Sequence, residues 1–176
     1  NDMLIFGCPS SIFRLEGDPR INGQLQVLTR STGIIGPRAW CFDGQGTLWF
    51  MGISGLYRLP LGAPEPENIS KERLVSVLDH LTAEALFVQM AYDPYDSTIR
   101  IFTTPVNGVT VGTHVVYDIR QDAFWTDQLP LDHGPWSVAQ PYGSNSVDRR
   151  PVFGGNDGYL RSFSDAATSD DGTSID

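Results

Sequence analysis

The chain has 176 residues, of which 40% are hydrophobic and 19% are charged. It is long enough to bury a core, and its composition is neither that of a disordered protein nor that of a membrane protein. The formal net charge of −9, from 21 acidic and 12 basic residues, argues against a general nucleic-acid surface, because phosphates require clustered lysine and arginine. Apolar runs such as residues 85–88 are far too short to span a bilayer, so we expect no membrane contact.

Three segments near the start, the middle and the end of the chain align without a gap: 6–14, 50–58 and 153–161. Each reads Phe, four mostly turn-prone residues, Ser or Gly, two apolar residues and Arg. The pattern predicts a β-hairpin in which the Phe ends one strand, the Gly, Ser, Asn and Asp residues form the turn, and the apolar pair begins the return strand. The stem of the recurring Arg can cover apolar neighbours while its guanidinium reaches solvent or a carboxylate.

The spacing of these hairpins predicts a fourth copy. The starts are 44 and 103 residues apart, and half of the second interval places another start near position 102. Phe102 stands there, at the end of the expected strand 98–102, followed by a polar hairpin over 103–113 and a return strand over 114–117. The resulting periods of 44, 52 and 51 residues are typical of a four-stranded propeller blade.

Other strands flank each hairpin. We expect inner strands at 39–43, 89–93 and 136–139, and fourth strands at 24–28 and 123–126. Two alternatives stay open in the second copy, because 74–78 fits a fourth strand while Ser70 to Leu81 fits a short helix capped by Ser70. Residues 62–67 before it have the composition of a surface linker.

The first copy lacks an inner strand, since residues 2–7 occupy the second-strand position, and the last copy ends after its third strand. The sequence therefore predicts an all-β chain with propeller blades over residues 1–164, starting near 6, 50, 102 and 153, and a flexible polar tail over 165–176. We favour part of a larger propeller over a ring closed by complementation of the missing strands.

Residues that carry chemistry are few. The histidines His80, His114 and His133 lack the spacing of a metal site or a catalytic pair, and ordinary surface or core roles are expected for them. Propeller glycosidases use paired acids, but the turn positions of the four candidate carboxylates favour capping of the backbone; these are Asp43, Asp93, Asp96 and Asp157. No calcium-loop pattern is present. We expect no catalytic residue, cofactor or metal.

Cysteines and tryptophans are the remaining candidate residues. Cys8 and Cys41 fall in apolar, strand-like segments and fit neither a disulfide framework nor a zinc cluster, which favours reduced cysteines, with a bridge between them left open. Trp40, Trp49 and Trp136 lie in repeat strands, where packing between blades is favoured over sugar stacking. Trp125, on an outer strand, is the best candidate for an exposed contact.

The repeat resembles two kinds of known protein. The stretch 43–58 is similar to the repeat of sensor-type propellers. Most of residues 33–163 resembles virion structural proteins of tailed bacteriophages, on the following segments: 33–41, 43–58, 91–93 leading to 101–102, 114–118 with 124–125, and 154–161. This second resemblance implies a propeller-bearing tail component of the nozzle or tail-hub type, which forms a ring with copies of itself and contacts neighbouring tail proteins.

The resemblance also implies a scaffold without catalytic residues, located in the phage tail of the virion and assembled in the host cytoplasm. Its contacts would come from variable loops such as Val106–Thr113 and Tyr142–Arg149. The alternative is a carbohydrate-binding or ligand-sensing propeller, including a glycosidase. A funnel mouth lined by convergent acids and exposed aromatic rings would favour that alternative.

Overall fold

The computed structural model describes residues 3–71, 73, 86–107, 112–130 and 133–165, together with strands at 169–170 and 173–174. Across these residues the chain is built of strands joined by turns, with one short 3-10 segment, η2 (Val147–Arg149). The strands form four antiparallel sheets, called sheets 1 to 4 here, and a small terminal hairpin. The all-β prediction is confirmed, and the assignment of the sheets to a propeller stays a prediction.

Each sheet is a meander in which neighbours in sequence are neighbours in space. Sheet 1 contains β1 (Met3–Gly7), β2 (Ile12–Glu16) and β3 (Gln24–Thr29). Sheet 2 contains β4 (Trp40–Phe42), β5 (Leu48–Gly52), β6 (Gly55–Leu59) and β7 (Glu67–Asn68). Sheet 3 contains β8 (Leu86–Asp93), β9 (Thr98–Pro105), β10 (Thr113–Asp118) and β11 (Ala123–Gln128). Sheet 4 contains β12 (Ser137–Ala139), β13 (Val152–Gly154) and β14 (Leu160–Ser162), and the terminal hairpin pairs β15 (Ser169–Asp170) with β16 (Thr173–Ser174).

The predicted hairpins are present. Phe6 pairs with Phe13 in sheet 1, and Phe50 pairs with Tyr57 in sheet 2. Gly55 and Gly158 turn the second and last hairpins with φ of 124° and 85°, the left-handed region that favours glycine. In sheet 4 Phe153 pairs with Arg161 itself, so this loop is one residue longer than the gapless alignment implied.

The hairpin of sheet 3 differs from its prediction. Strand β9 runs on to Pro105, because Thr103 and Thr104 pair with β8, so the loop is shorter than 103–113. Phe102 also points toward sheet 4, where its ring lies 5.9 Å from that of Phe153. Ile101 packs instead into the apolar core between sheets 2 and 3, the position that the repeat predicts for Phe102. The residue of sheet 3 that corresponds to Phe50 and Phe153 is therefore Ile101, one position earlier than predicted.

The fourth strands at 24–28 and 123–126 are confirmed by β3 and β11. In sheet 2 the fourth strand is β7, which begins at Glu67 inside the segment assigned to a linker. The alternatives at 74–78 and 70–81 lie outside the described residues, apart from the first positions of the helix. There, Ser70 is buried, its Oγ accepts a hydrogen bond from the Leu56 amide at 2.9 Å, and it donates to Asn68 Oδ1.

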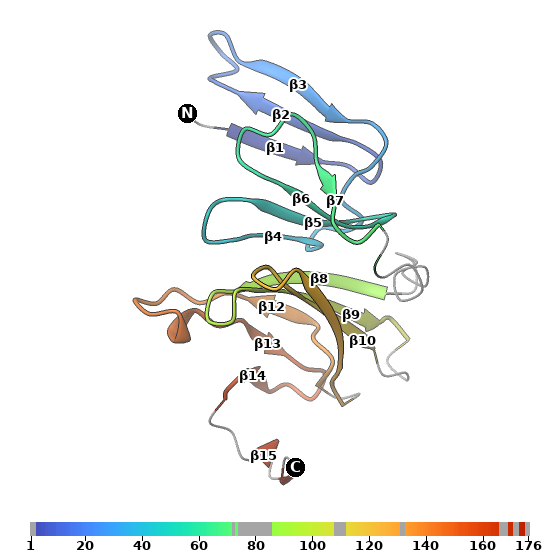
Figure 1. Cartoon of the computed structure of the whole chain (residues 1–176), viewed down its shortest axis with the longest axis vertical. Coiled ribbons are helices and arrows are strands. Elements are labelled where there is room, and N and C mark those ends of the chain that lie inside the picture. The colour runs from blue at the N-terminus through green and yellow to red at the C-terminus, as the bar shows by residue number, and fades with distance from the viewer. Residues whose placement is uncertain are drawn as a thin grey trace.

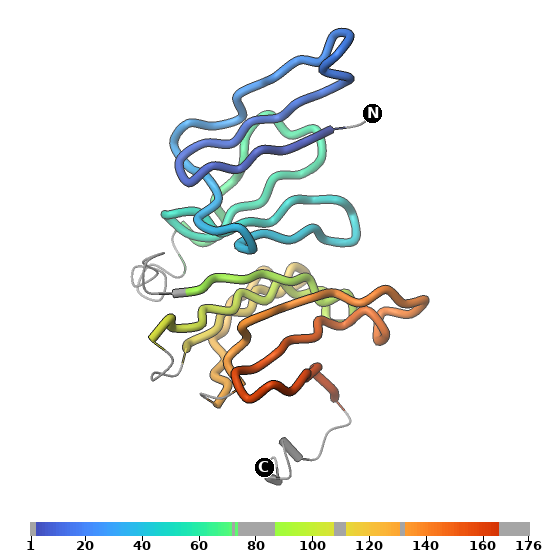
Figure 2. The backbone as a smooth tube through the Cα atoms, turned by 180° about the vertical axis from the view of Figure 1, so that it is seen from behind, coloured from blue at the N-terminus to red at the C-terminus, as the bar shows by residue number. Residues whose placement is uncertain are grey.

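The sheets stack on one another in chain order, from sheet 1 at the N-terminus to sheet 4 (Figures 1 and 2). Side chains alternate between the two faces of a strand, so each inner sheet buries both faces. One apolar core joins sheets 1 and 2 through Ile12, Leu28, Leu48, Phe50 and Leu59. A larger core joins sheets 2 and 3, where Trp49 lies 5.5 Å from Tyr117 between ring centroids, as predicted for a tryptophan that packs between blades.

Sheets 3 and 4 meet through rings and polar contacts. Besides Phe102 and Phe153, the rings of Phe87 and Trp136 stack at 6.3 Å, but Trp136 stays 37% exposed, so the packing predicted for this residue is present only in part. The buried amide of Gln89 in β8 donates to the Pro135 carbonyl at 3.0 Å and accepts from the Val138 amide at 3.1 Å. At this junction the hydrogen bonds of the Gln89 amide thus take the place of part of the apolar packing that joins sheets 1 and 2 and sheets 2 and 3.

Candidate functional site

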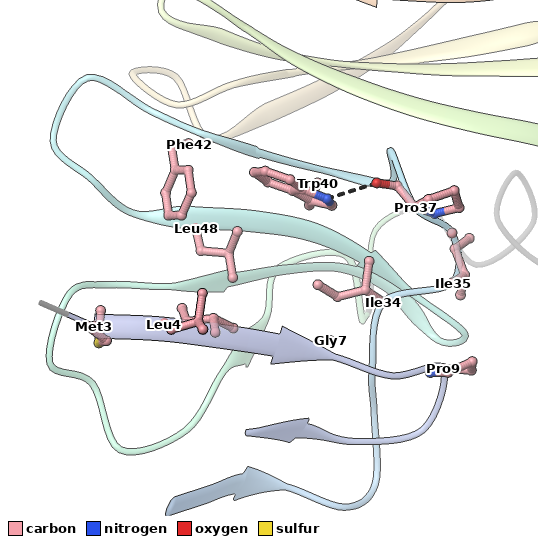
Figure 3. A pocket seen from close by; sticks show the side chains of 12 residues that line it. Met3, Leu4, Gly7, Pro9, Ile34, Ile35, Pro37, Trp40, Phe42 and Leu48 are labelled. Carbon is pink, nitrogen blue, oxygen red and sulfur yellow. Dashed lines mark hydrogen bonds between the residues drawn. The ribbon is translucent and has the colours of Figure 1, made fainter. Parts of the chain in front are cut away.

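An apolar groove of about 710 Å³ lies between β1 and sheet 2. Its walls come from β1 on one side and from β4 and β5 on the other, as Figure 3 shows. The lining residues are glycines, prolines and large apolar residues: Met3, Leu4, Ile5, Gly7, Pro9, Ile34, Ile35, Gly36, Pro37, Trp40, Phe42 and Leu48. None of them carries a charge or a hydroxyl group, so the groove suits an apolar occupant.

Two aromatic rings dominate the sheet 2 wall. Trp40 and Phe42 are 42% and 47% exposed, and their rings meet edge to face with centroids 5.7 Å apart. The Trp40 indole donates to the Pro37 carbonyl at 3.0 Å (Figure 3), which fixes the orientation of the ring. Because Trp40 pairs with Phe50 and Phe42 with Leu48, both aromatic rings lie on the face of sheet 2 that points toward sheet 1.

The floor of the groove is held by backbone contacts. The Ile34 amide donates to the Cys8 carbonyl at 2.9 Å, and the Ile35 amide donates to the Met51 carbonyl at 3.0 Å. A Cβ atom at Gly7 would lie 2.5 Å from Ile34 Cδ1, so a larger residue at this position would require the Ile34 side chain to move. The groove is therefore preformed, with its floor tied to both neighbouring sheets.

A comparison of Trp40 with the equivalent residues of sheet 3 shows why Trp40 is exposed. The corresponding inner strand there, β8, presents Val88 and Met90 to sheet 2, and these are 6% and 7% exposed because β4 lies over them. In the part of the chain that the structure describes, sheet 1 has three strands and β1 is its edge. No fourth strand of these residues covers Trp40, and the prediction that it packs between blades is not met.

The outer face of sheet 1 is also apolar. Its strand registers place six side chains on the face that points away from sheet 2; one of them, Leu4, lies on the edge strand β1 and also borders the groove. They form two rows across the sheet, Leu4–Leu15–Leu25 and Phe6–Phe13–Val27. Leu4 and Leu25 are 53% and 62% exposed, although face-to-face packing buries the apolar faces of the inner sheets. Contiguous apolar surface of this kind marks an interaction site.

The outer face of sheet 4 has the opposite character. The registers place small side chains there, with Leu160 as the main protrusion: Ser137, Gly154 and Leu160 in one row, and Ala139, Val152 and Ser162 in the other. The two ends of the stack are thus one bulky apolar face and one face of mostly small residues.

The carboxylates weighed as catalytic acids serve structural roles. Asp43 Oδ1 accepts the amides of Gln45 and Thr47 at 2.8 and 2.9 Å, and its Oδ2 accepts the Trp49 indole N–H at 3.0 Å. Asp93 and Asp157 likewise accept amides two residues on, which is the backbone capping that the sequence predicted. Asp157 also accepts a hydrogen bond from the Arg161 guanidinium, which lowers the pKa of this carboxyl to about 2.

Asp96 was expected to cap its own turn and instead joins an ionic cluster between sheets 3 and 4. Arg150, 7% exposed in its side chain, reaches three carboxylates: Asp93 at 3.2 Å, Asp96 at 2.8 Å and Asp165 at 2.9 Å. Two hydrogen bonds lower the pKa of Asp165: the larger contribution comes from Arg150 and the smaller one from Tyr95. The local sequence around Arg150 does not indicate this cluster, because its carboxylate partners lie 54 or more residues away or in the tail.

Arg100 is the second cation of this cluster. It pairs with Asp96 at 3.2 Å and lies over the Phe163 ring at 3.7 Å. Its burial lowers the pKa of the guanidinium, although the neighbouring carboxylates keep the charged form favourable. Two buried cations thus face one buried carboxylate, Asp93, and two that are partly exposed, Asp96 and Asp165, and the cluster links sheet 3 to the segments that flank β13 and β14.

The histidines have ordinary positions where they are described. His114 is buried, and its Nδ1 accepts the Thr103 amide at 3.1 Å, which places the proton of the neutral ring on Nε2. Burial lowers the pKa of this imidazole to about 4. His133 lies in the connection before β12, and His80 falls outside the described residues.

The remaining predicted site residues are also located. Trp125 is 44% exposed on the edge strand β11, so the expected exposure is present while its contact stays a prediction. It pairs with Val116 on the face toward sheet 4, which has three strands among the described residues. Cys41 is buried in β4 and burial raises the pKa of its thiol, whereas Cys8 is exposed in a turn rather than in a strand. Both are free.

Among the described residues, no group of three or more His, Cys, Asp and Glu side chains is placed to hold a metal ion. No helix in that part of the chain is long and apolar enough to cross a membrane. Comparison with protein-family models found no match, and comparison with curated proteins found none either.

Proposed function

We propose that this chain is a non-enzymatic structural component of a bacteriophage tail, in which its sheets are consecutive propeller blades that assemble with further copies into a ring. The observation that carries the proposal is the contrast between the two ends of the stack. Sheet 1 ends in a bulky apolar face and sheet 4 ends in a face of small side chains. No further sheet of the described residues packs on either face.

The blade assignment is supported by how the sheets are joined. Sheets 2 and 3 are four-stranded antiparallel meanders, the unit from which propellers are built. Their first strands lie against each other, since β4 contacts β8 and β8 contacts β12. A propeller places the first strand of every blade around a central axis, and this succession of contacts fits that arrangement.

The ring follows from the pairing of unlike faces. Large side chains pack best against small ones, so Phe6 and Leu25 of one copy fit against Ser137 and Gly154 of the next. Such a contact is head to tail, and head-to-tail contacts generate rings when the rotation closes. The resemblance of residues 33–163 to virion structural proteins favours a tail ring among such assemblies.

The absence of enzymatic activity is part of the proposal. The carboxylates Asp43, Asp93 and Asp157 are engaged by backbone amides, and Asp96 is engaged by arginine. A glycosidase needs one carboxylic acid and one carboxylate facing a shared cleft. The alternative of sugar binding receives little support from the groove, because its lining contains no charged or hydroxyl side chain to bond a sugar.

The ring can be tested by measuring the mass of the assembly in solution by light scattering and native mass spectrometry, with electron microscopy of the particles. We expect a closed oligomer that Leu25→Glu converts to a monomer, because the charge would be placed within the contact. Ile21→Glu is the matched control, since Ile21 is 81% exposed in the turn between β2 and β3, outside the two apolar rows. A wild-type monomer at high concentration would contradict the ring.

The tail location needs a separate measurement. An antibody raised against the chain should label the tail of the virions that carry it when the particles are viewed by electron microscopy. Label confined to capsids, or none on purified particles, would reject the tail role while leaving the ring result unaffected.

A further inference from the structure

We propose that His114 is an acid-sensitive latch: the neutral imidazole holds the ends of β9 and β10 together, and its protonation separates them and loosens sheet 4 from sheet 3. The latch lies within one junction of the chain and is therefore independent of the tail function proposed above. It is built from the contacts of the imidazole, from the hydrogen bonds that link them to sheet 4, and from the charges around the ring.

The imidazole of His114 takes the place of a backbone contact at the end of a strand pair. The ladder of paired residues between β9 and β10 ends at Ile101 and Val115. Beyond that point side chains join the two strands: the Thr103 amide donates to His114 Nδ1 at 3.1 Å, and the Thr103 hydroxyl donates to the Thr113 carbonyl. One of these bonds therefore requires a nitrogen lone pair on the imidazole.

Protonation of His114 removes that lone pair. A neutral imidazole has one donor and one acceptor nitrogen, whereas an imidazolium has two donors and no acceptor, so no rotation of the ring restores a partner for the Thr103 amide. Nε2 of His114 already has no hydrogen-bond partner among the described residues. Since the residue is 2% exposed, the imidazolium would be a buried charge without an acceptor on either nitrogen. The strand end relieves this state by opening, which brings the ring into water.

Three hydrogen bonds connect this strand end to sheet 4. Thr104, the residue after Thr103, is buried, and its hydroxyl donates to the Pro135 carbonyl at 2.7 Å. The same carbonyl accepts the side-chain amide of Gln89 at 3.0 Å, and the side-chain oxygen of Gln89 accepts the amide of Val138 in β12 at 3.1 Å. Release of the end of β9 displaces Thr104 and so disturbs the contacts through which Gln89 holds β12.

The charges around the ring set the pH range of the latch. Burial lowers the pKa of His114 from 6.5 to about 4, and Asp127, which pairs with His114 from β11, opposes that shift. Other titratable and charged groups at this junction belong to sheet 3, to β14 and to the segments that flank the strands of sheet 4; they include Asp93, Asp96, Arg100, Asp118, Arg161, His133, Arg150, Asp157 and Asp165. The latch is therefore closed at neutral pH and opens as the pH falls from 6.5 toward 4.

Amide hydrogen exchange of the full chain, followed by NMR and corrected for the intrinsic effect of pH, tests the latch. The protection of the Thr103 and Val138 amides should fall at least tenfold between pH 7 and pH 4.5, because the lowered pKa of the imidazole multiplies the open fraction roughly fiftyfold over this range. The Met51 amide, bonded to the Ala39 carbonyl within sheet 2, is the internal reference. At pH 4.5 Thr103 and Val138 should exchange at least tenfold faster than Met51, because opening leaves sheet 2 folded.

Two variants separate the acceptor of His114 from its titration. His114→Asn supplies a side-chain oxygen that accepts the Thr103 amide and does not titrate, so the protection of Thr103 should change less than threefold over the same pH range. His114→Phe keeps a ring but has no acceptor, so Thr103 should be at least tenfold less protected than in the wild type already at pH 7. His133→Asn is the matched control and should keep the wild-type fall.

Four results would overturn the latch. They are equal protection of Thr103 and Met51 at pH 4.5, which would mean that the whole chain unfolds; a fall at Thr103 without one at Val138; a wild-type fall in His114→Asn; and full protection of Thr103 at pH 7 in His114→Phe. Because the first two results need only the wild-type chain, the test does not depend on the folding of either variant.

Discussion

The junction between sheets 2 and 3 and the junction between sheets 3 and 4 use different chemistry for the same task. The first is apolar throughout its centre, with Trp49, Met51 and Ile99 fully or almost fully buried. The second places the Arg150–Asp93 ion pair between the sheets, and at another point along β8 it places the Gln89 amide, which bonds both Pro135 and Val138. Sheet 3 therefore makes apolar contacts on its face toward sheet 2 and includes buried polar contacts on its face toward sheet 4.

The difference indicates what each junction depends on. Apolar burial is non-directional and stabilises in proportion to area, so the first junction tolerates small changes of angle. A buried ion pair contributes little net stability, because desolvation offsets the Coulomb attraction, but removing one partner leaves an uncompensated charge. We infer that the polar junction fixes the orientation of sheet 4, whereas the apolar junction supplies most of the stability.

The largest expected effect comes from emptying the apolar junction. Trp49→Ala removes a side chain that is 2% exposed and leaves a cavity against Tyr117, so we expect a loss of about 4 kcal/mol in the free energy of unfolding, measured in urea. Trp125→Ala is the control, and its loss should stay below about 1 kcal/mol because that ring is already half in solvent. Equal losses in the two variants would refute the assignment of Trp49 to the core.

The next effect comes from breaking the polar junction. Arg150→Met keeps much of the volume but leaves Asp93 and Asp96 to share Arg100 and deprives Asp165 of its arginine, so we expect a loss of about 3 kcal/mol in urea unfolding. Arg150→Lys should recover part of this loss, since lysine keeps the charge but cannot reach three carboxylates with one planar fork.

The adjacent Arg149 supplies a matched control for that experiment. It is exposed and bonds the Asn145 carbonyl, so Arg149→Met should change the free energy of unfolding by less than about 0.5 kcal/mol. If Arg150→Met is equally mild, the carboxylates relax into solvent and the cluster does not orient sheet 4.

Much of this architecture could be predicted from local sequence. The hairpins around Phe6, Phe50 and Phe153 combine turn residues with apolar strands, and that signal lies within nine residues. The capping by Asp43 and Asp157 is local for the same reason. Strand β7 could not be found this way, because two polar residues after prolines carry no period, and it forms through pairing with β6.

The features that depend on contacts between distant residues were beyond a single sequence. Arg150 meets Asp93 across 57 positions, and nothing near either residue specifies the other. The groove could not be predicted from the sequence, because only the strand register shows that Trp40 lies on the face of sheet 2 toward sheet 1.

A smaller effect is expected in the pH dependence of the free energy of unfolding, to which the junction between sheets 3 and 4 contributes through His114. His114 lies on the face of sheet 3 toward sheet 4, and burial lowers its pKa from 6.5 to about 4, with Asp127 across the strand pair opposing the shift. The folded state then binds fewer protons than the unfolded chain, so this stability is complete above pH 6.5 and is lost as the pH falls toward 4. Between pH 7 and pH 5 the loss should be about 2 kcal/mol.

His114→Phe tests this contribution, since phenylalanine keeps a ring against Phe102 and cannot titrate. Urea unfolding at pH 7 and pH 5 should show a loss in the variant about 2 kcal/mol smaller than in the wild type. The same loss in both proteins would mean that the imidazole reaches water and that carboxylates cause the pH dependence.

The smallest effect concerns the polar contact that borders the apolar junction. Asp43→Ala removes the acceptor for two turn amides and for the Trp49 indole, and we expect a loss of about 1 kcal/mol. Asp18→Ala is the control, because Asp18 caps an exposed turn with no link to a buried ring. Trp49→Phe deletes the indole N–H, so a double-mutant cycle with Asp43→Ala isolates that one bond. A coupling near zero would show that apolar packing alone positions Trp49. A coupling of about 0.5 kcal/mol or more would show that even the apolar junction uses one hydrogen bond to set the direction of its largest ring.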